Sequence, residues 1–307
     1  MSTPTAPVPT APASTAPVAT GAVTARRASA YRRKAAFLRQ LRIWSGVATC
    51  VLFLLPIAWM ILTSLKQQRD IFTTPPTLFF TPTLDTYINY LTNHDLPARM
   101  LNTLIVAGGA GLISIIVGAM AGYALARIRL RGATTIGVII LLSRGVPPIA
   151  LAVPMFLVAR SMGLLDKHIT LILAYCTFLI PYVMWLMRGF FKALPEELEE
   201  AAKIDGCTRF GAFFRIIVPI SLPGLLSTLI FSIILAWEEL LFALVLTNRS
   251  ASTVPVVISG IAGDTVNGAN WGALTAVGTM TFIPVVIFAL LVQKWLIKGL
   301  ADGATKG

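Results

Sequence analysis

Long apolar stretches alternate with short polar segments along most of the chain. Each apolar stretch holds about 20 residues or more, which is the length that an α-helix needs to cross a bilayer. The stretches predict transmembrane helices over about 43–65, 102–126, 134–161, 169–191, 220–247 and 271–298. The pattern therefore predicts an all-α integral membrane protein with six transmembrane helices.

The polar segment between the fourth and fifth stretches is predicted to fold outside the bilayer. Proline suits the first position of a helix and glycine the position just after a helix ends, so Pro195 and Gly206 predict a short helix between them. Thr208 is placed to cap a second short helix, which Pro219 would end at the membrane. The segment is expected to form a helix–turn–helix.

The first of these two helices has an acidic start and a slim face. Acidic residues occupy its first turn, where the helix dipole favours negative charge. Glu199 and Lys203 stand one turn apart in the favourable acid-first order. Ala201 and Ala202 leave a face of small residues, which would allow close docking into a cleft of another protein.

The same residues resemble the EAA loop of binding-protein-dependent ABC importer permeases. That pattern is EAA, three residues, G, nine residues and I-x-L-P, and here Val218 replaces the leucine. The resemblance implies a type I permease fold in which the loop 192–219 carries the coupling helix that sits in a groove of a cytoplasmic ATPase. It assigns that contact to Glu200, Ala201, Ala202, Asp205, Gly206 and Pro219. The competing interpretation is an ordinary amphipathic connector.

Composition agrees with a membrane protein, because 56% of the 307 residues are hydrophobic, 12% are charged and the mean hydropathy is +0.79. The net charge of +12 would also suit a nucleic-acid-binding protein. However, about 18 of the 25 basic residues lie at the same face of the six predicted spans. The positive-inside rule explains this bias without nucleic acid, and it predicts that both termini and the central loop are cytoplasmic.

Residues 1–42 are predicted to form a cytoplasmic tail. About the first 25 residues are Thr, Pro, Ala and Ser without periodicity, which is typical of disorder. The basic segment that follows, 26–42, suggests a helix lying on anionic lipid. A secretory signal fits poorly, because the apolar stretch starts late, is too long and lacks a cleavage site.

The C-terminal tail, 299–307, is predicted to be cytoplasmic. The ending resembles the GL-x-x-GA-x-KG ending of the maltose-type, carbohydrate-transporting branch of the same permeases. In that branch the tail reaches toward the ATPase dimer. The resemblance as a whole covers about 43–307.

Two spans carry features that suggest more than simple membrane crossing. Gly118-x-x-x-Gly122 in the second span would let another helix approach closely, although glycine is common in membrane helices. The third span is expected to be irregular at Arg144 and at Pro147-Pro148. Arg144 is expected either to snorkel to the cytoplasmic interface or to act in gating or substrate passage.

The fifth span contains Trp237, Glu238 and Glu239, a place where sugar-type relatives often read Trp-Asn-Asp/Glu-Phe. An aromatic ring can cover an apolar sugar face and carboxylates can accept hydroxyl hydrogens, so these residues and Arg144 are candidates for a substrate pathway. The alternative is a structural polar clamp between helices, with Arg144 as a candidate partner.

The chain lacks the residue patterns of an enzyme. It has no G-x-x-x-x-G-K-[ST] motif, so ATP hydrolysis is expected to belong to a partner. His94 and His168 lack metal-ligand spacing, and no metal or cofactor is expected. The three cysteines, Cys50, Cys176 and Cys207, are expected to be free thiols.

Two candidate functions are consistent with these sequence features. In the first, the chain is one permease subunit of an ATP-driven importer, with a second permease, two ATPase subunits and an extracytoplasmic solute-binding protein as partners. The resemblance implies a sugar, oligosaccharide, polyol or glycerol-phosphate-like substrate. In the second, the chain is a self-sufficient channel or secondary transporter that uses Glu238 and Glu239 as proton relays, for which internal repeats would be evidence; no convincing repeat is visible.

Overall fold

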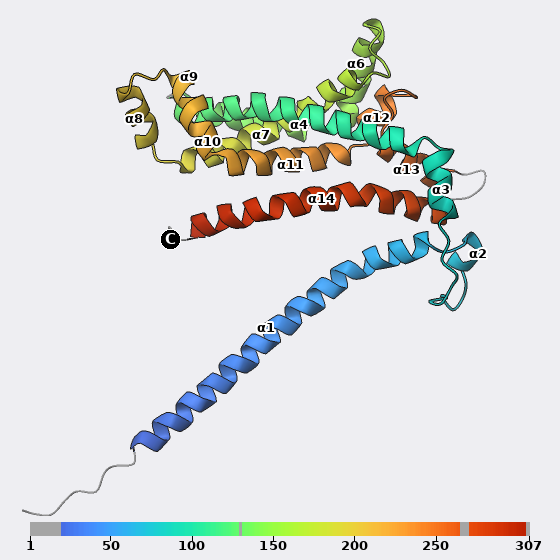
Figure 1. Cartoon of the computed structure of the whole chain (residues 1–307). Coiled ribbons are helices and arrows are strands. Elements are labelled where there is room, and N and C mark those ends of the chain that lie inside the picture. Colours follow the sequence, from blue (N-terminus) through green and yellow to red (C-terminus); the bar gives the residue numbers. More distant parts are fainter. Residues whose placement is uncertain (1–19, 129–130, 265–269, 305–307) are drawn as a thin grey trace, which may run out of the picture. The chain divides into compact units, whose positions relative to one another are not determined.

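Every regular element in the described residues is a helix (Figure 1). The computed structural model describes residues 20–128, 131–264 and 270–304, with side chains described for 37–128, 131–264 and 270–293. The elements, in chain order, are α1 (Thr20–Ser64), α2 (Gln68–Ile71), α3 (Asp85–Thr92), α4 (Leu96–Arg127), α5 (Ala133–Leu142), the 3₁₀ turn η1 (Ser143–Gly145), α6 (Pro148–Ser161), α7 (His168–Ala193), α8 (Glu197–Ile204), α9 (Arg209–Ala212), the π-helical segment η2 (Phe213–Ile217), α10 (Val218–Ile220), α11 (Leu222–Trp237), α12 (Leu241–Leu246), α13 (Val254–Ala262) and α14 (Trp271–Ala304).

Four helical segments are long and apolar enough to cross a membrane, at Phe37–Ser64, Leu96–Arg127, His168–Ala193 and Trp271–Gln293. Two bent helix pairs raise the number to six if each pair is one span. One pair joins Ala133–Gly145 to Pro148–Ser161 with a bend of 84°, and the other joins Arg209–Ile220 to Leu222–Trp237 with a bend of 78°. The apolar pattern therefore located the helices, and the predicted irregularity of the third span is present.

The chain divides into two compact units, residues 1–58 and 59–307. In the first unit the described backbone is the part of α1 that starts at Thr20. The basic segment of the expected tail is helical and continues into the first span as one helix, not as a separate helix. The helix is continuous because no helix-breaking residue lies between the basic segment 26–42 and the first predicted span. The predicted disorder of residues 1–19 lies outside the described residues.

The second unit is built around α4, α7 and α11, which lie side by side (Figure 1). The glycines of the predicted GxxxG motif are the reason that α4 and α7 approach closely. A Cβ at Gly118 would lie 2.7 Å from the Val183 side chain, and a Cβ at Gly122 would lie 2.7 Å from the carbonyl oxygen of Met184. The small-residue face of α4 is therefore a helix-packing surface, as expected.

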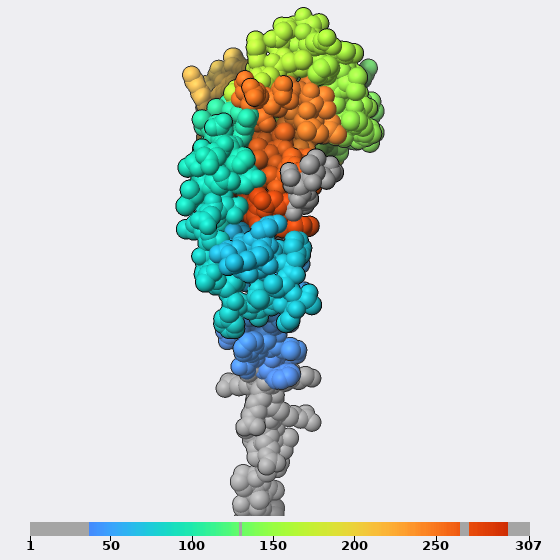
Figure 2. Space-filling view, turned by 90° about the vertical axis from the view of Figure 1, so that its right-hand side faces the viewer, coloured from blue at the N-terminus to red at the C-terminus, as the bar shows by residue number. Residues whose placement is uncertain are grey.

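Three buried apolar clusters fill this unit, and two of them involve α7. One lies around Tyr175 and Leu179 of α7 and Phe242 of α12, and the other joins α4, α7 and η2 through Ile115 and Phe191. The short helix α12 packs against α6, and Figure 2 shows their surfaces next to each other at one end of the unit. The second cluster lies at the opposite end and supports the central polar segment.

The predicted fifth span, 220–247, is not one helix. The helix α11 ends at Trp237, and α12 begins at Leu241. The carboxylate of Glu239 accepts hydrogen bonds from the backbone N–H groups of Phe242 and Ala243, at 3.1 and 3.4 Å. A side chain that satisfies the free N–H groups of a first turn favours a new helix start, so Glu239 explains the break. The sixth predicted span, in contrast, continues as helix to Ala304.

Candidate functional site

The helix α8 is the predicted first helix of the central polar segment, and it ends at the predicted glycine. Gly206 has φ +83°, a left-handed conformation that glycine adopts without strain. Its N–H donates to the Lys203 carbonyl at 3.0 Å, and the Cys207 N–H donates to the Ala202 carbonyl at 2.9 Å. These two bonds form a Schellman motif, which satisfies carbonyl groups at the helix end.

The other predicted boundaries of this segment are partly right. Thr208 caps α9, because its hydroxyl accepts the Gly211 N–H at 3.1 Å. Pro195, however, precedes the helix, which begins at Glu197. Pro219 lies one residue before the end of the continuous helical segment Arg209–Ile220, so the predicted end is displaced by a single residue. The chain bends after Ile220 instead.

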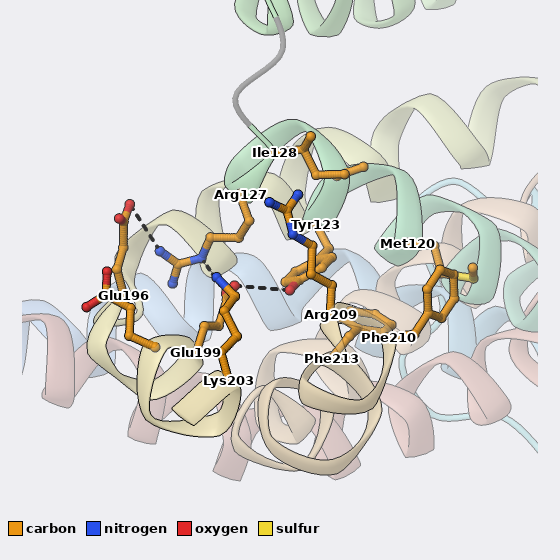
Figure 3. Close-up of a pocket in the computed structure, with 12 residues that line it drawn as sticks. Met120, Tyr123, Arg127, Ile128, Glu196, Glu199, Lys203, Arg209, Phe210 and Phe213 are labelled. Atoms are coloured by element: carbon orange, nitrogen blue, oxygen red, sulfur yellow. Dashed lines mark hydrogen bonds and ion pairs between the residues drawn. The ribbon is translucent and has the colours of Figure 1, made fainter. Parts of the chain in front are cut away.

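Arg127, the last residue of α4, connects three elements at this end of the molecule (Figure 3). Its Nη2 donates to the carbonyl of Leu194, just past the end of α7, at 2.7 Å. Its Nε lies 2.9 Å from a carboxylate oxygen of Glu199, and its Nη1 lies 3.5 Å from one of Glu196. One guanidinium thus binds the end of α7 and two acids at the start of α8.

The Arg127–Glu199 contact is a buried ion pair. The side chains are 6% and 10% exposed, respectively. The Nε–Oε1 approach is a charge contact and not an aligned hydrogen bond, while the other carboxylate oxygen of Glu199 accepts the Tyr123 hydroxyl at 3.1 Å. A buried charge that loses its partner costs about 3–5 kcal/mol. The Tyr123–Arg127–Glu199 cluster therefore fixes α8 on α4.

The remaining face of α8 is open to solvent. Ala202 is buried, whereas the other predicted coupling residues, Glu200, Ala201, Asp205, Gly206 and Pro219, are exposed. Ile204 at the end of the helix is 86% exposed, although it is large and apolar. The exposed side of α8 thus combines the small and acidic residues of the EAA motif with one large apolar side chain.

The candidate residues of the substrate pathway are arranged differently from the expectation. Trp237 is 2% exposed and packs edge-to-face against Phe288 of α14, with ring centroids 6.0 Å apart. Its indole N–H has no hydrogen-bond partner among the described residues. The ring is therefore enclosed between helices, and stacking on a sugar would require a rearrangement.

The two acids and Arg144 are not joined. Glu239 caps the start of α12, and Glu238 is exposed. Arg144 is exposed on η1, with its guanidinium 4.9 Å from the centre of the Tyr182 ring. Within the described part of the chain, no ion pair connects Arg144 to either acid. The clamp through Arg144 is therefore not formed, and substrate contact by Glu238 stays a prediction.

The opposite end of α7 carries a second polar cluster, around Asp166. Its carboxylate accepts hydrogen bonds from the backbone N–H groups of four consecutive residues, 248–251, at 2.9–3.1 Å. Burial alone would raise the pKa of Asp166, but these four donors together hold it well below its usual range. Asp166 thus ties the α6–α7 connection to the loop that follows α12.

The two histidines, His94 and His168, make packing and hydrogen-bonding contacts. His168 Nε2 lies 2.7 Å from Asn102 Oδ1, and the His94 ring stacks on Tyr90 with centroids 4.4 Å apart. In the residues that the structure describes, no group of three or more His, Cys, Asp or Glu side chains is arranged to hold a metal ion.

The sequence of the chain matches a known family of membrane proteins. The model of the family described as "Binding-protein-dependent transport system inner membrane component" matches residues 114–302, well over half of the chain. The chain belongs to this family. It is a multi-pass membrane permease of the ABC importer class, and the resemblance drawn from the central polar segment is confirmed. The self-sufficient transporter is accordingly not supported.

Curated relatives match nearly the whole permease. The diacetylchitobiose uptake system permease DasC of Streptomyces coelicolor is 34% identical over 87% of this chain and 98% of the relative. The trehalose transport permease SugB of Mycobacterium tuberculosis is 34% identical over 88% and 99%. The trehalose/maltose permease MalG of Thermococcus litoralis is 33% identical over 90% and 99%.

Solved structures agree on the type I permease fold. A chain of a bacterial ABC transporter involved in the import of the acidic polysaccharide alginate is 25% identical, with a TM-score of 0.64 over 86% of the permease and 97% of that chain. A chain of the bacterial alginate transporter in complex with an alginate pentasaccharide-bound periplasmic protein has a TM-score of 0.61 at 15% identity, over 83% and 94% of the two chains.

Proposed function

We propose that the permease carries a carbohydrate, or a related polyol or glycoside, across the cytoplasmic membrane. A second permease subunit completes the pathway, two ATP-binding cassette subunits hydrolyse ATP, and an extracytoplasmic solute-binding protein delivers the substrate. The uptake of diacetylchitobiose, trehalose and maltose by the named relatives supports the carbohydrate class. The periplasmic protein in the complex of a solved structural neighbour supports the delivery step.

The observation that carries the coupling role is the two-sided character of α8. One side is fixed to α4 by the buried Arg127–Glu199 pair, and the other side presents Ile204, which is 86% exposed. A partner protein that binds the exposed side of α8 would move α4 together with α8, because separating the buried Arg127–Glu199 pair is costly. Closure of the ATPases on ATP would then shift the spans between two positions.

The orientation follows from charge. The exposed coupling face and the basic residues near both termini are proposed to lie in the cytoplasm, since basic residues concentrate in cytoplasmic loops. The Asp166 end of α7 would then face outside, where the solute-binding protein docks. Because the half-buried Glu239 carboxylate already accepts backbone N–H groups and Trp237 is enclosed, Glu238 is the acid with a carboxylate free to meet a polar substrate.

Copurification tests this function. The tagged permease is isolated from gently solubilised native membranes, beside a variant in which residues 200–206 are replaced by a flexible linker. We expect the native chain alone to bring down a P-loop ATPase, and both chains to retain the second permease. Uptake of radiolabelled disaccharides by the native complex then tests the substrate class. A native chain that comes down alone, or a complex that takes up amino acids and not sugars, would overturn the proposal.

A further inference from the structure

A cavity of about 480 Å³ lies between the end of α4 and the pair α8–α9. In Figure 3 the Glu196–Arg127 contacts lie on one side of the drawn cavity, and Met120 and Phe210 lie on the opposite side. The exposed cations Lys203 and Arg209 also line it, and neither forms an ion pair within the described residues. The cavity thus has unpaired positive charge next to an apolar wall.

A second cavity of about 240 Å³ continues from the first, and Met120 and Phe213 line both. It is a groove between α4 and α11, and every side chain that lines it is apolar. Ile116 of α4 and Phe214 of η2 are 60% and 54% exposed along it. The first cavity lies at the end of α4, a span, where a bilayer changes from hydrocarbon to headgroups, and the groove runs from Met120 into the span.

We propose that the two cavities form one binding site for a glycerophospholipid. The phosphate lies between Lys203 and Arg209, and an acyl chain lies in the groove between α4 and α11. A phosphate between two cations makes charge-assisted hydrogen bonds, and the chain covers apolar surface that is otherwise exposed. The bound lipid contacts α4, α8 and α9 together, so it would stiffen the connection between the coupling helix and the spans.

The charge of the first cavity favours a zwitterionic headgroup. Three acids and three bases line it: Glu196, Glu199, Glu200, Arg127, Lys203 and Arg209. Since Arg127 is already bound to Glu196 and Glu199, the groups left for a ligand are Lys203, Arg209 and Glu200, the last of which the resemblance also assigns to the ATPase contact. A phosphoethanolamine headgroup offers a phosphate for the two cations and an ammonium for the acid.

Photocrosslinking tests this site. The full-length permease, purified with its co-isolated subunits, is incubated with a phosphatidylethanolamine that carries a diazirine on one acyl chain. We expect crosslinks in the peptides that contain 115–120 and 225–229. The double variant Lys203→Ala/Arg209→Ala should reduce the yield roughly tenfold, because two charge-assisted contacts are lost. Both side chains are exposed, so the variant should fold.

The control variant Lys192→Ala/Arg215→Ala removes the same charge from two exposed positions that do not line either cavity, and its crosslink yield should equal that of the wild type. An excess of inorganic phosphate should not compete, because it cannot fill the groove. Equal loss in both double variants, competition by phosphate alone, or an absence of crosslinks in the wild type would overturn the proposal. Crosslinking of the groove to another protein chain would do the same.

Discussion

At the scale of single residues, the contacts that hold the coupling helix are not the ones that sequence spacing suggests. The spacing pairs Glu199 with Lys203 along the same helix, but in the structure Glu199 pairs with Arg127 of α4. The motif identified α8, and the capping by Thr208 was predictable because both depend on local sequence. The Arg127 pair joins residues far apart in the sequence, and its only signal was an arginine ending an apolar stretch.

Breaking the buried pair should destabilise the permease. We expect Arg127→Ala and Glu199→Ala each to lower the free energy of unfolding by about 3–5 kcal/mol, because each leaves an uncompensated buried charge. The double variant should be less unstable than the sum of the two. Thermal unfolding of the purified protein measures this, with the exposed Glu197→Ala as the matched control. Losses no larger than that of the control would show that the pair is not structurally important.

Asp166 should make stability pH-dependent in the acid range. Its pKa is lowered in the folded state, so its contribution is present above the unfolded value of 3.8 and is lost as the pH falls toward the folded value. We expect Asp166→Asn to lower the melting temperature at pH 7, and the difference from the wild type to shrink below about pH 4. The control is Asp85→Asn. A difference that stays constant down to pH 3 would contradict the assignment.

At the scale of elements, the apolar pattern predicted where helices lie better than where they bend. The close packing of α4 and α7 follows from the glycine spacing, which is visible in the sequence. The break between Trp237 and Leu241 was not predictable from hydropathy, because the pattern remains apolar on both sides of the two acids. It depends on the carboxylate of Glu239, which reaches forward to accept backbone N–H groups in the first turn of α12.

Filling the α4–α7 contact should separate the two helices. Gly122→Ala would place a Cβ 2.7 Å from the Met184 carbonyl oxygen, which is backbone and cannot move alone. We expect a loss of about 1–3 kcal/mol in unfolding free energy, as for other overpacked cores. Gly108→Ala on the same helix meets nothing within 4 Å and should be neutral or slightly stabilising. Equal effects of the two substitutions would contradict close packing at Gly122.

At the scale of the whole molecule, the charge bias makes a prediction about sidedness. In a background with the three cysteines replaced by serine, single cysteines are introduced as Gly163→Cys, Lys203→Cys and Gly307→Cys. A membrane-impermeant maleimide added to intact cells should label only the first, and the other two should react once the membrane is opened. Labelling of the Lys203→Cys variant from outside would reverse the proposed orientation.

The central claim is that the exposed face of α8 transmits ATPase motion to the spans. Ile204→Lys tests it most directly, because the side chain is 86% exposed, and a lysine at a helix C-terminus keeps the helix stable while it places a charge in the docking surface. The control is Phe79→Lys, at a side chain that is 98% exposed and lies outside the central polar segment.

The measurement is sugar uptake and ATP hydrolysis by the reconstituted transporter. We predict that Ile204→Lys inserts and folds like the wild type but loses uptake at least tenfold, with hydrolysis no longer stimulated by the solute-binding protein, whereas Phe79→Lys retains both. Normal uptake and normal stimulation in Ile204→Lys would contradict the account.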